Sequence, residues 1–225
     1  MKAMLTDLPD LAAYWKLDLA TGALTQDSSR NSNHGTVIGA SPAQGQIDGA
    51  YSFDGLNDRI DCGTDSSLNL RDQITIEAHI KRDSIGTNDL IVNRRDGAAP
   101  AEENYTLQIL GNNKIQFAYR NEANTATHEW RSTPLIDDLG FHYIGLSFTF
   151  GTGASLICVL DHKVIAGIWA GGTGNVLPID LPAIPLFLGA TTYLANWFHG
   201  ILDHIPIHSR ALDATELIRH SYRAY

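Results

Sequence analysis

The chain has 225 residues, of which 44% are hydrophobic and 18% are charged, and its formal net charge is -9. This composition excludes a disordered or low-complexity chain and favours one globular domain with a large core. The acidic balance disfavours nucleic acid and anionic membrane surfaces as partners.

The first ten residues contain charges and a proline where a secretory signal peptide needs an unbroken apolar stretch. No segment approaches the roughly 18 consecutive apolar residues of a membrane span. The sequence therefore shows no export signal and predicts no membrane insertion. Cys62 and Cys158 are too few for a disulfide scaffold and lack zinc-site spacing. We expect two buried thiols, with one long-range disulfide as the alternative.

Short alternating runs bounded by Gly, Asn, Asp and Pro dominate the chain, as is typical of strands with one buried face. In residues 74–81 the even positions are apolar and the odd ones polar, so the odd side chains are expected to meet solvent. About a dozen strands at this spacing predict two packed antiparallel sheets. The clearest runs are 13–17, 50–54, 59–62, 74–81, 105–110, 114–119, 142–149, 156–160, 184–188 and 198–207.

Two local features are more specific. The tripeptide Gly111-Asn112-Asn113 separates the runs 105–110 and 114–119 and suits a tight hairpin turn with positive φ. Near the C-terminus, Asp213 and Glu216 have the spacing of a helical capping box. The apolar stripe that follows predicts one short helix.

A series of segments carries a family resemblance: residues 12–18, 27–35, 51–58, 74–80, 141–144, 159–163 and 198–207. In this order they resemble laminin-G-like domains of the concanavalin A-like lectin/glucanase superfamily. The resemblance implies an all-β, two-sheet antiparallel jelly-roll sandwich over residues 12–225, preceded by an extension of residues 1–11. Three residues depart from the family pattern: His162 replaces the usual turn glycine, and His204 and Pro206 replace an acidic and a basic residue. Pro206 cannot donate to a ladder, so its strand is expected to be an edge or to bulge there.

The loop at residues 27–35 is dense in the oxygen donors that calcium prefers. The resemblance implies a structural calcium ion between this loop and the last strand, with Asp27, Asn31, Asn33 and Asp203 as ligands. The alternative is an Asx-rich turn held by its own side-chain hydrogen bonds.

Aromatic and amide side chains in or beside Gly- and Asn-rich loops are the candidates for ligand binding, because sugar rings stack on aromatic faces. These candidates are Tyr119, Asn121, Trp130 and Trp169, with core packing as the alternative role for the aromatic ones. Trp15 is assigned to the core, and the nine histidines, which lack any zinc motif, to solvent-facing strand positions.

No predicted strand carries the two alternating carboxylates of the superfamily's glycosidases, since Glu77 stands alone on its strand. We therefore expect a non-catalytic, lectin-like domain that binds carbohydrate or a surface protein rather than a glycosidase. The alternative is an adhesive or structural protein, such as a decoration or tail component of a virus particle, that assembles as a homo-oligomer or in a virion. Without an export signal, a virion is favoured over a cell surface as its location.

Overall fold

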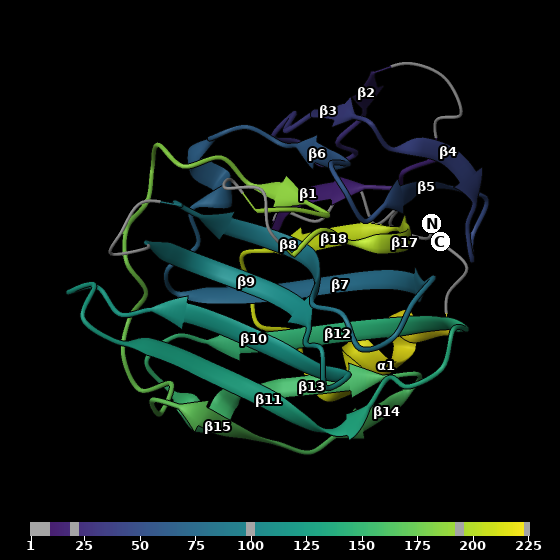
Figure 1. The fold of residues 1–225 in the computed structure, drawn as a ribbon. Coiled ribbons are helices and arrows are strands. Elements are labelled where there is room, and N and C mark those ends of the chain that lie inside the picture. Colours follow the sequence, from purple (N-terminus) through teal and green to yellow (C-terminus); the bar gives the residue numbers. More distant parts are fainter. Residues whose placement is uncertain (1–9, 19–22, 98–101, 192–195, 223–225) are drawn as a thin grey trace, which may run out of the picture.

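The computed structural model describes residues 10–18, 23–97, 102–191 and 196–222, and these fold into two antiparallel sheets packed face to face (Figure 1). Sheet A has the order β14 (Lys163–Ile165), β13 (Ile157–Leu160), β12 (Phe141–Thr149), β7 (Gln73–Arg82), β17 (His199–Asp203), β5 (Gly49–Asp54) and β4 (Ser41–Gln44), and β18 (Ile205–His208) joins β7 to β1 (Leu11–Trp15). Sheet B has the order β15 (Gly167–Gly171), β11 (Thr127–Leu135), β10 (Lys114–Arg120), β9 (Glu103–Ile109), β8 (Asp89–Arg95), β16 (Phe187–Leu188), β6 (Arg59–Asp61), β3 (Gly35–Ile38) and β2 (Leu24–Thr25). The predicted all-β sandwich is confirmed.

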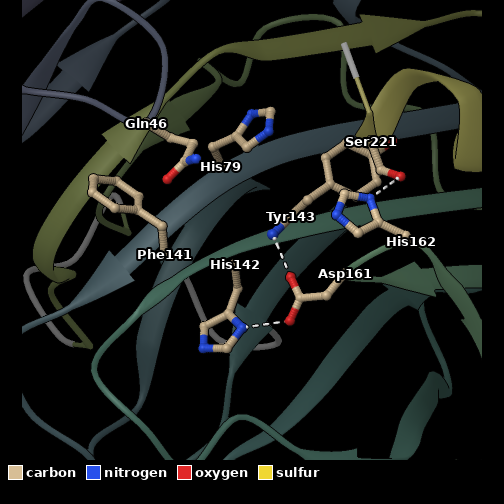
Figure 2. A pocket seen from close by; sticks show the side chains of 8 residues that line it. All are labelled: Gln46, His79, Phe141, His142, Tyr143, Asp161, His162 and Ser221. Carbon is tan, nitrogen blue, oxygen red and sulfur yellow. Dashed lines mark hydrogen bonds and ion pairs between the residues drawn. The ribbon is translucent and has the colours of Figure 1, made fainter. Parts of the chain in front are cut away.

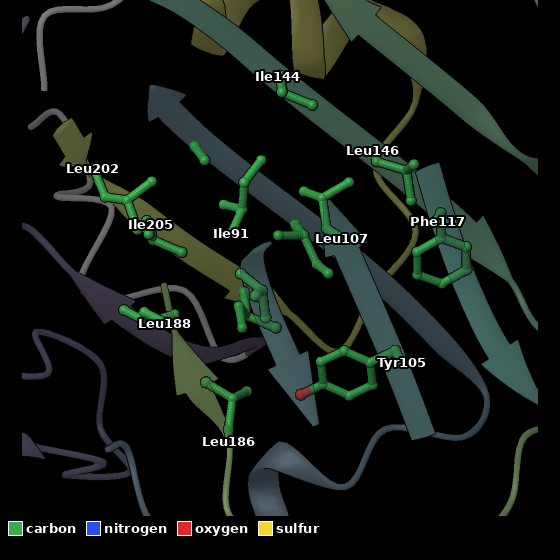
Figure 3. Close-up of a cluster of buried hydrophobic side chains, with 14 of the residues drawn as sticks. Ile91, Tyr105, Leu107, Phe117, Ile144, Leu146, Leu186, Leu188, Leu202 and Ile205 are labelled. Carbon is green, nitrogen blue, oxygen red and sulfur yellow. The ribbon is translucent and has the colours of Figure 1, made fainter. Parts of the chain in front are cut away.

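The core lies between the two sheets, where alternate side chains of facing strands meet. Ile76 and Ile80 of β7 point inward from sheet A, and Leu107 and Phe117 point inward from sheet B. Figure 3 shows this layer, in which the labelled side chains of both sheets converge. Trp15 is fully buried there, as predicted, and its indole N–H donates to the carbonyl of Asn33 at 2.7 Å.

The outer face of sheet A is covered, contrary to the solvent exposure predicted for the odd positions of β7. Thr75, Glu77 and His79 are 0%, 1% and 5% exposed. The cause is helix α1 (Ala214–Ser221), whose Leu217 packs on Tyr143 of β12 on the side away from the core. The prediction that the histidines face solvent is wrong for five of the nine. The buried ones are His79, His128, His204, His208 and His220. His128 lies on β11 of sheet B, and the other four lie in sheet A, between two of its strands or in the helix that packs on it.

Both local predictions are confirmed. The β9–β10 hairpin turns at Asn113 with a φ of 63°. Helix α1 begins with the predicted capping box, in which Asp213 accepts from the backbone of Glu216 and the Glu216 side chain accepts from the backbone of Asp213. No described helix has the length and apolar character needed to cross a membrane.

The strand predicted at residues 198–207 is broken into β17 and β18 at His204, which has a φ of 44°. The irregularity expected at Pro206 therefore falls two residues earlier, and Pro206 itself lies opposite Tyr14 in the β1–β18 ladder. Residues 1–9 of the predicted N-terminal extension lie outside the described residues. Leu11, the last residue assigned to that extension, is buried and begins β1.

Two short 3₁₀ turns, Ser66–Leu68 and Gly153–Ser155, complete the described elements. Cys62 and Cys158 are both free and buried, which confirms the expectation of two apolar thiols. Burial raises the pKa of both thiols.

Candidate functional site

The predicted calcium loop is held by hydrogen bonds within the protein. Asp27 accepts from the backbone N–H groups of Tyr14 and Ser29 through Oδ1 and of Asn33 through Oδ2, each at 2.8 Å. The Ser29 hydroxyl donates to Oδ2 as well, at 2.6 Å. Four donors occupy both oxygens of Asp27, so this carboxylate does not fit a calcium ligand in this conformation.

The two asparagines of the same loop face the first strand. The side-chain amides of Asn31 and Asn33 both donate to the carbonyl of Ala12, at 2.8 and 3.0 Å. Asn33 also donates to the hydroxyl of Ser67 at 2.8 Å. The loop is thus an Asx-rich turn that ties the segment before β3 to β1.

Asp203, the fourth predicted ligand, lies in a different group. Its Oδ2 accepts from the backbone N–H of Ile47 at 3.0 Å. It clusters with Asp18 and His204, whose ligand atoms and its own all lie within 4.8 Å of one another. Sequence analysis did not single out Asp18, although it is the last residue of the recognisable segment 12–18. We call these three residues the Asp18 cluster.

Burial and like charge dominate the electrostatics of the Asp18 cluster. Burial, together with the charge of Asp18, raises the pKa of Asp203 to about 7 despite its backbone hydrogen bonds. Burial also lowers the pKa of His204 to about 3, with His79 and Lys16 adding to the effect. The His204 imidazole is therefore neutral at pH 7.

Two of the three predicted ligand-binding aromatics are buried. Tyr119 and Trp130 are 0% and 5% exposed, and Trp169 packs partly buried against the core. The Tyr119 ring stacks on His128 at a centroid distance of 5.1 Å. Asn121 closes its own turn, because its Oδ1 accepts from the backbone of residues 125 and 126.

A polar cavity of about 90 Å³ opens instead on the outer side of sheet A (Figure 2). Its residues come from the turn before β5, from β7 and β12, from the β13–β14 turn and from the end of α1. They are Gln46, His79, Phe141, His142, Tyr143, Asp161, His162 and Ser221. We call this feature the sheet A cavity.

Asp161 organises one wall of the sheet A cavity. Its Oδ2 lies 2.7 Å from Nδ1 of His142, and its Oδ1 accepts from the backbone N–H of Tyr143 at 2.9 Å (Figure 2). Asp138 lies 3.1 Å from the other ring nitrogen of His142. The hydrogen bond to Asp161 raises the pKa of His142, and although burial raises the pKa of Asp161, the bond from His142 holds it below the ordinary value.

The same wall is built on a strained turn. Asp161 and His162 both have positive φ, 44° and 72°, as a two-residue hairpin loop with type I′ geometry requires. His162 takes the place of the glycine that such a turn favours, and its Nδ1 lies 2.7 Å from the Ser221 hydroxyl of α1. Its ring stacks on Tyr222 at 4.0 Å. The backbone strain thus accompanies a side chain that connects the turn to the helix.

The sheet A cavity combines an aromatic ring with hydrogen-bonding groups of both kinds. Phe141 is half-buried, and burial lowers the pKa of His79 to about 4, so its imidazole is a neutral donor and acceptor. Among the described residues that line the cavity, Asp161 is the one carboxylate. The pair of carboxylates that glycoside hydrolysis uses is therefore not assembled there.

Solved structures with the same fold include proteins of several activities. Domain 4 of the extracellular arabinanase AbnA from Geobacillus stearothermophilus, in complex with arabinotriose, superposes with a TM-score of 0.71 at 16% identity, over 94% of this chain and 98% of that one. The binding domain of Paraclostridial Mosquitocidal Protein 1 superposes with a TM-score of 0.71 at 13% identity, over 94% of this chain and 52% of that one. Trypanosoma rangeli sialidase superposes with a TM-score of 0.67 at 14% identity, over 96% of this chain and 33% of that one.

This chain therefore spans about half of the mosquitocidal binding domain and a third of the sialidase, and at these identities the likeness shows the fold alone. No curated protein sequence matches it. The family model described as the concanavalin A-like lectin/glucanases superfamily matches residues 53–218, which is most of the chain, and the protein belongs to that family.

Proposed function

We propose that this protein is a non-catalytic carbohydrate-binding domain and that the sheet A cavity receives one end of a glycan. The observation that carries the proposal is the meeting of the Phe141 ring with His142, Asp161 and Gln46 in one solvent-open hollow. Sugar rings need an apolar face to stack on and polar groups for their hydroxyls, and these four side chains supply both. The cavity is smaller than the several hundred Å³ of typical ligand pockets, which suits a terminal residue rather than an internal one.

Support for a carbohydrate ligand comes from the arabinanase domain, which has nearly the same length as this chain and was solved with arabinotriose. The first probes are therefore arabino-oligosaccharides, followed by a glycan array for other sugars. Binding is measured by isothermal titration calorimetry. We expect Phe141→Ala and His142→Ala each to weaken the binding of any glycan that the wild type binds by about tenfold or more, since each removes one of few contacts.

The matched control is Ile168→Ala, which truncates a side chain that is 66% exposed on β15 of sheet B. This variant should bind as the wild type does. If both cavity variants bind the glycan with wild-type affinity, the glycan binds elsewhere on the protein. The absence of binding to any glycan would overturn the proposal.

The non-catalytic part of the proposal has its own test. The protein is incubated with arabinan, sialyl-oligosaccharides and β-glucans, and the products are separated by chromatography. We expect no turnover. Hydrolysis that disappears on substitution of one carboxylate, Asp161 or Glu77, would contradict it.

A second candidate function is assembly at the surface of a virus particle or cell. It is favoured by exposed apolar side chains on strands β11, β14 and β15, where Leu135, Val164 and Ile168 are 44%, 53% and 66% exposed. Strands at sheet edges carry unpaired backbone groups that can pair with another copy. Light scattering would show an oligomer that Ile168→Lys dissociates, and electron microscopy of particles from the source would show the protein on them. If the wild type and Ile168→Lys are both monomers, this function is contradicted.

A further inference from the structure

The Asp18 cluster brings together residues from distant parts of the chain. Asp18 follows the end of β1, Asp203 is the last residue of β17, and His204 occupies the break between β17 and β18. Nε2 of His204 lies 3.8 Å from Oδ1 of Asp203 and 4.0 Å from Oδ1 of Asp18. Two carboxylate oxygens thus face the same imidazole nitrogen.

The hydrogen bonding of the cluster is incomplete. Asp203 is fully buried, and its Oδ1 accepts no hydrogen bond from the residues that the structure describes. The Oδ1 atom of Asp18 is in the same state. Buried polar atoms are nearly always partnered, so two such oxygens pointing at one site indicate a cation between them.

His204 is oriented as a metal-binding histidine is. Its Nδ1 lies 2.7 Å from the Tyr14 hydroxyl, on a tyrosine that is 1% exposed. A fixed partner on one ring nitrogen sets the orientation of the ring. When Nδ1–H donates to the Tyr14 oxygen, the lone pair of the other nitrogen is available to the ion. Here that other nitrogen is Nε2, which faces the two carboxylates.

The donor set does not suit the calcium ion that the family resemblance implies. Calcium takes six to eight oxygen ligands, whereas imidazole nitrogen is a ligand of zinc, cobalt, nickel and similar ions. The distances of 3.8 and 4.0 Å from Nε2 of His204 to the two carboxylate oxygens would accommodate calcium or a transition metal. The imidazole nitrogen therefore decides which kind of ion the site prefers. We propose that Asp18, Asp203 and His204 form a binding site for a divalent transition metal of the zinc class.

An ion in this site would join three segments. The turn before β5 is already attached to it, because Ile47 donates to Asp203 and a Cβ added at Gly45 would lie 2.5 Å from the same carboxylate oxygen. Gln46 of that turn lines the sheet A cavity. The metal would therefore hold the end of β1, this turn and the β17–β18 break in place.

The test begins with protein treated with a chelator and dialysed, to which Zn²⁺, Co²⁺, Ca²⁺ or Mg²⁺ is added. We expect Zn²⁺ and Co²⁺ to bind one per chain by calorimetry, and Co²⁺ to give a visible absorption spectrum that Zn²⁺ abolishes. At about a hundred times its dissociation constant, Zn²⁺ should raise the Tm by roughly 5 to 10 °C. Binding of Ca²⁺ alone would overturn the proposal.

Substitutions identify the site. His204→Asp replaces the nitrogen with oxygen, so we expect the affinity for Zn²⁺ to fall and that for Ca²⁺ to rise. Tyr14→Phe should weaken Zn²⁺ binding by about 10- to 100-fold through loss of the orienting hydrogen bond. The control is His162→Ala, which removes an exposed histidine outside the cluster and should bind Zn²⁺ as the wild type does.

Asp18→Asn provides a variant that should fold, because this side chain is 33% exposed and at the edge of the site. It should bind Zn²⁺ more weakly than the wild type by at least about tenfold. If Zn²⁺ affinity is unchanged in both Asp18→Asn and His204→Asp, the metal binds elsewhere and the proposal is wrong.

Discussion

Nδ1 of His220, on helix α1, lies 3.1 Å from both carboxylate oxygens of Glu77, on strand β7, in an interface from which solvent is excluded. Nε2 of His208 lies 3.3 Å from the same carboxylate, and the Tyr143 hydroxyl donates to it at 2.5 Å. Burial raises the pKa of Glu77, but the close approach of the His208 and His220 rings outweighs it and holds the pKa well below its usual range. An ionised glutamate thus anchors the helix to sheet A.

Removing that carboxylate should be costly. We expect Glu77→Ala to lower the free energy of unfolding by about 3 to 5 kcal/mol, because it leaves several buried polar partners without an acceptor. Urea unfolding followed by circular dichroism measures the change. Glu129→Ala, which removes a half-buried surface glutamate, should cost less than about 1 kcal/mol. Equal losses in the two variants would show that the buried cluster does not hold α1.

The protein should lose stability as the pH falls below about 6.5, in part through His128. Nδ1 of this buried side chain accepts from the backbone N–H groups of Thr173 and Gly174, at 3.1 and 3.0 Å, so it must be unprotonated. Burial lowers its pKa from 6.5. The unfolded chain therefore takes up this proton first, and the contribution of His128 is complete above pH 6.5 and declines below it.

The matched variant for that prediction is His128→Asn, whose amide oxygen can accept but does not titrate. We expect its free energy of unfolding to depend less steeply on pH between 6.5 and 5 than that of the wild type. A parallel dependence in both proteins would assign the loss to other groups, of which His79 is the first candidate.

Strand β15 pairs closely with β11 at the edge of sheet B because Gly167 has no side chain. A Cβ at this position would overlap the Trp130 ring. We expect Gly167→Ala to destabilise the fold by about 1 to 3 kcal/mol through overpacking. Gly171→Ala is the control on the same strand, since its Cβ would meet its neighbours at 3.7 Å, an ordinary contact. Thermal melting of the two variants compares them, and equal melting temperatures would contradict the prediction.

A substitution at Asp27 can distinguish a hydrogen-bonded turn from a calcium site in this loop. Asp27→Asn should lower the free energy of unfolding by about 1 to 3 kcal/mol, because the amide cannot accept all the hydrogen bonds that the carboxylate accepts. We expect the same loss in excess calcium and in chelator. A wild-type stabilisation by calcium that this substitution abolishes would instead support the calcium ion that the family resemblance implies.

Sequence patterns predicted the features of this fold that depend on neighbours in the chain. The hairpin at Asn113 and the capping box at Asp213 follow from local backbone and hydrogen-bonding preferences, and both are present. The alternation of apolar and polar residues in β7 correctly predicted that Ile76 lies in the core. This pattern indicates only which face of the strand packs against the other sheet. It cannot show that α1 covers Glu77 on the opposite face.

The candidate sites were harder to predict for the same reason. Asp18 and Asp203 meet only because β1 and β17 lie in one sheet, and no spacing in the sequence relates them. Tyr119 sits beside a Gly- and Asn-rich loop, yet its ring points into the core and only its hydroxyl reaches a loop carbonyl, that of Val176. Exposure of an aromatic side chain depends on which face of the strand it occupies relative to layers contributed by distant segments.

Strand β18 lies between β1 and β7, so sheet A can be completed only with a strand that comes much later in the sequence than β1. During synthesis on a ribosome, β1 must wait until β18 has emerged. Such long-range pairing is slow to form and leaves strand edges open in the meantime. The growing chain is therefore exposed to aggregation until β18 has been made, and its yield in a cell should depend on chaperones that shield unpaired strands.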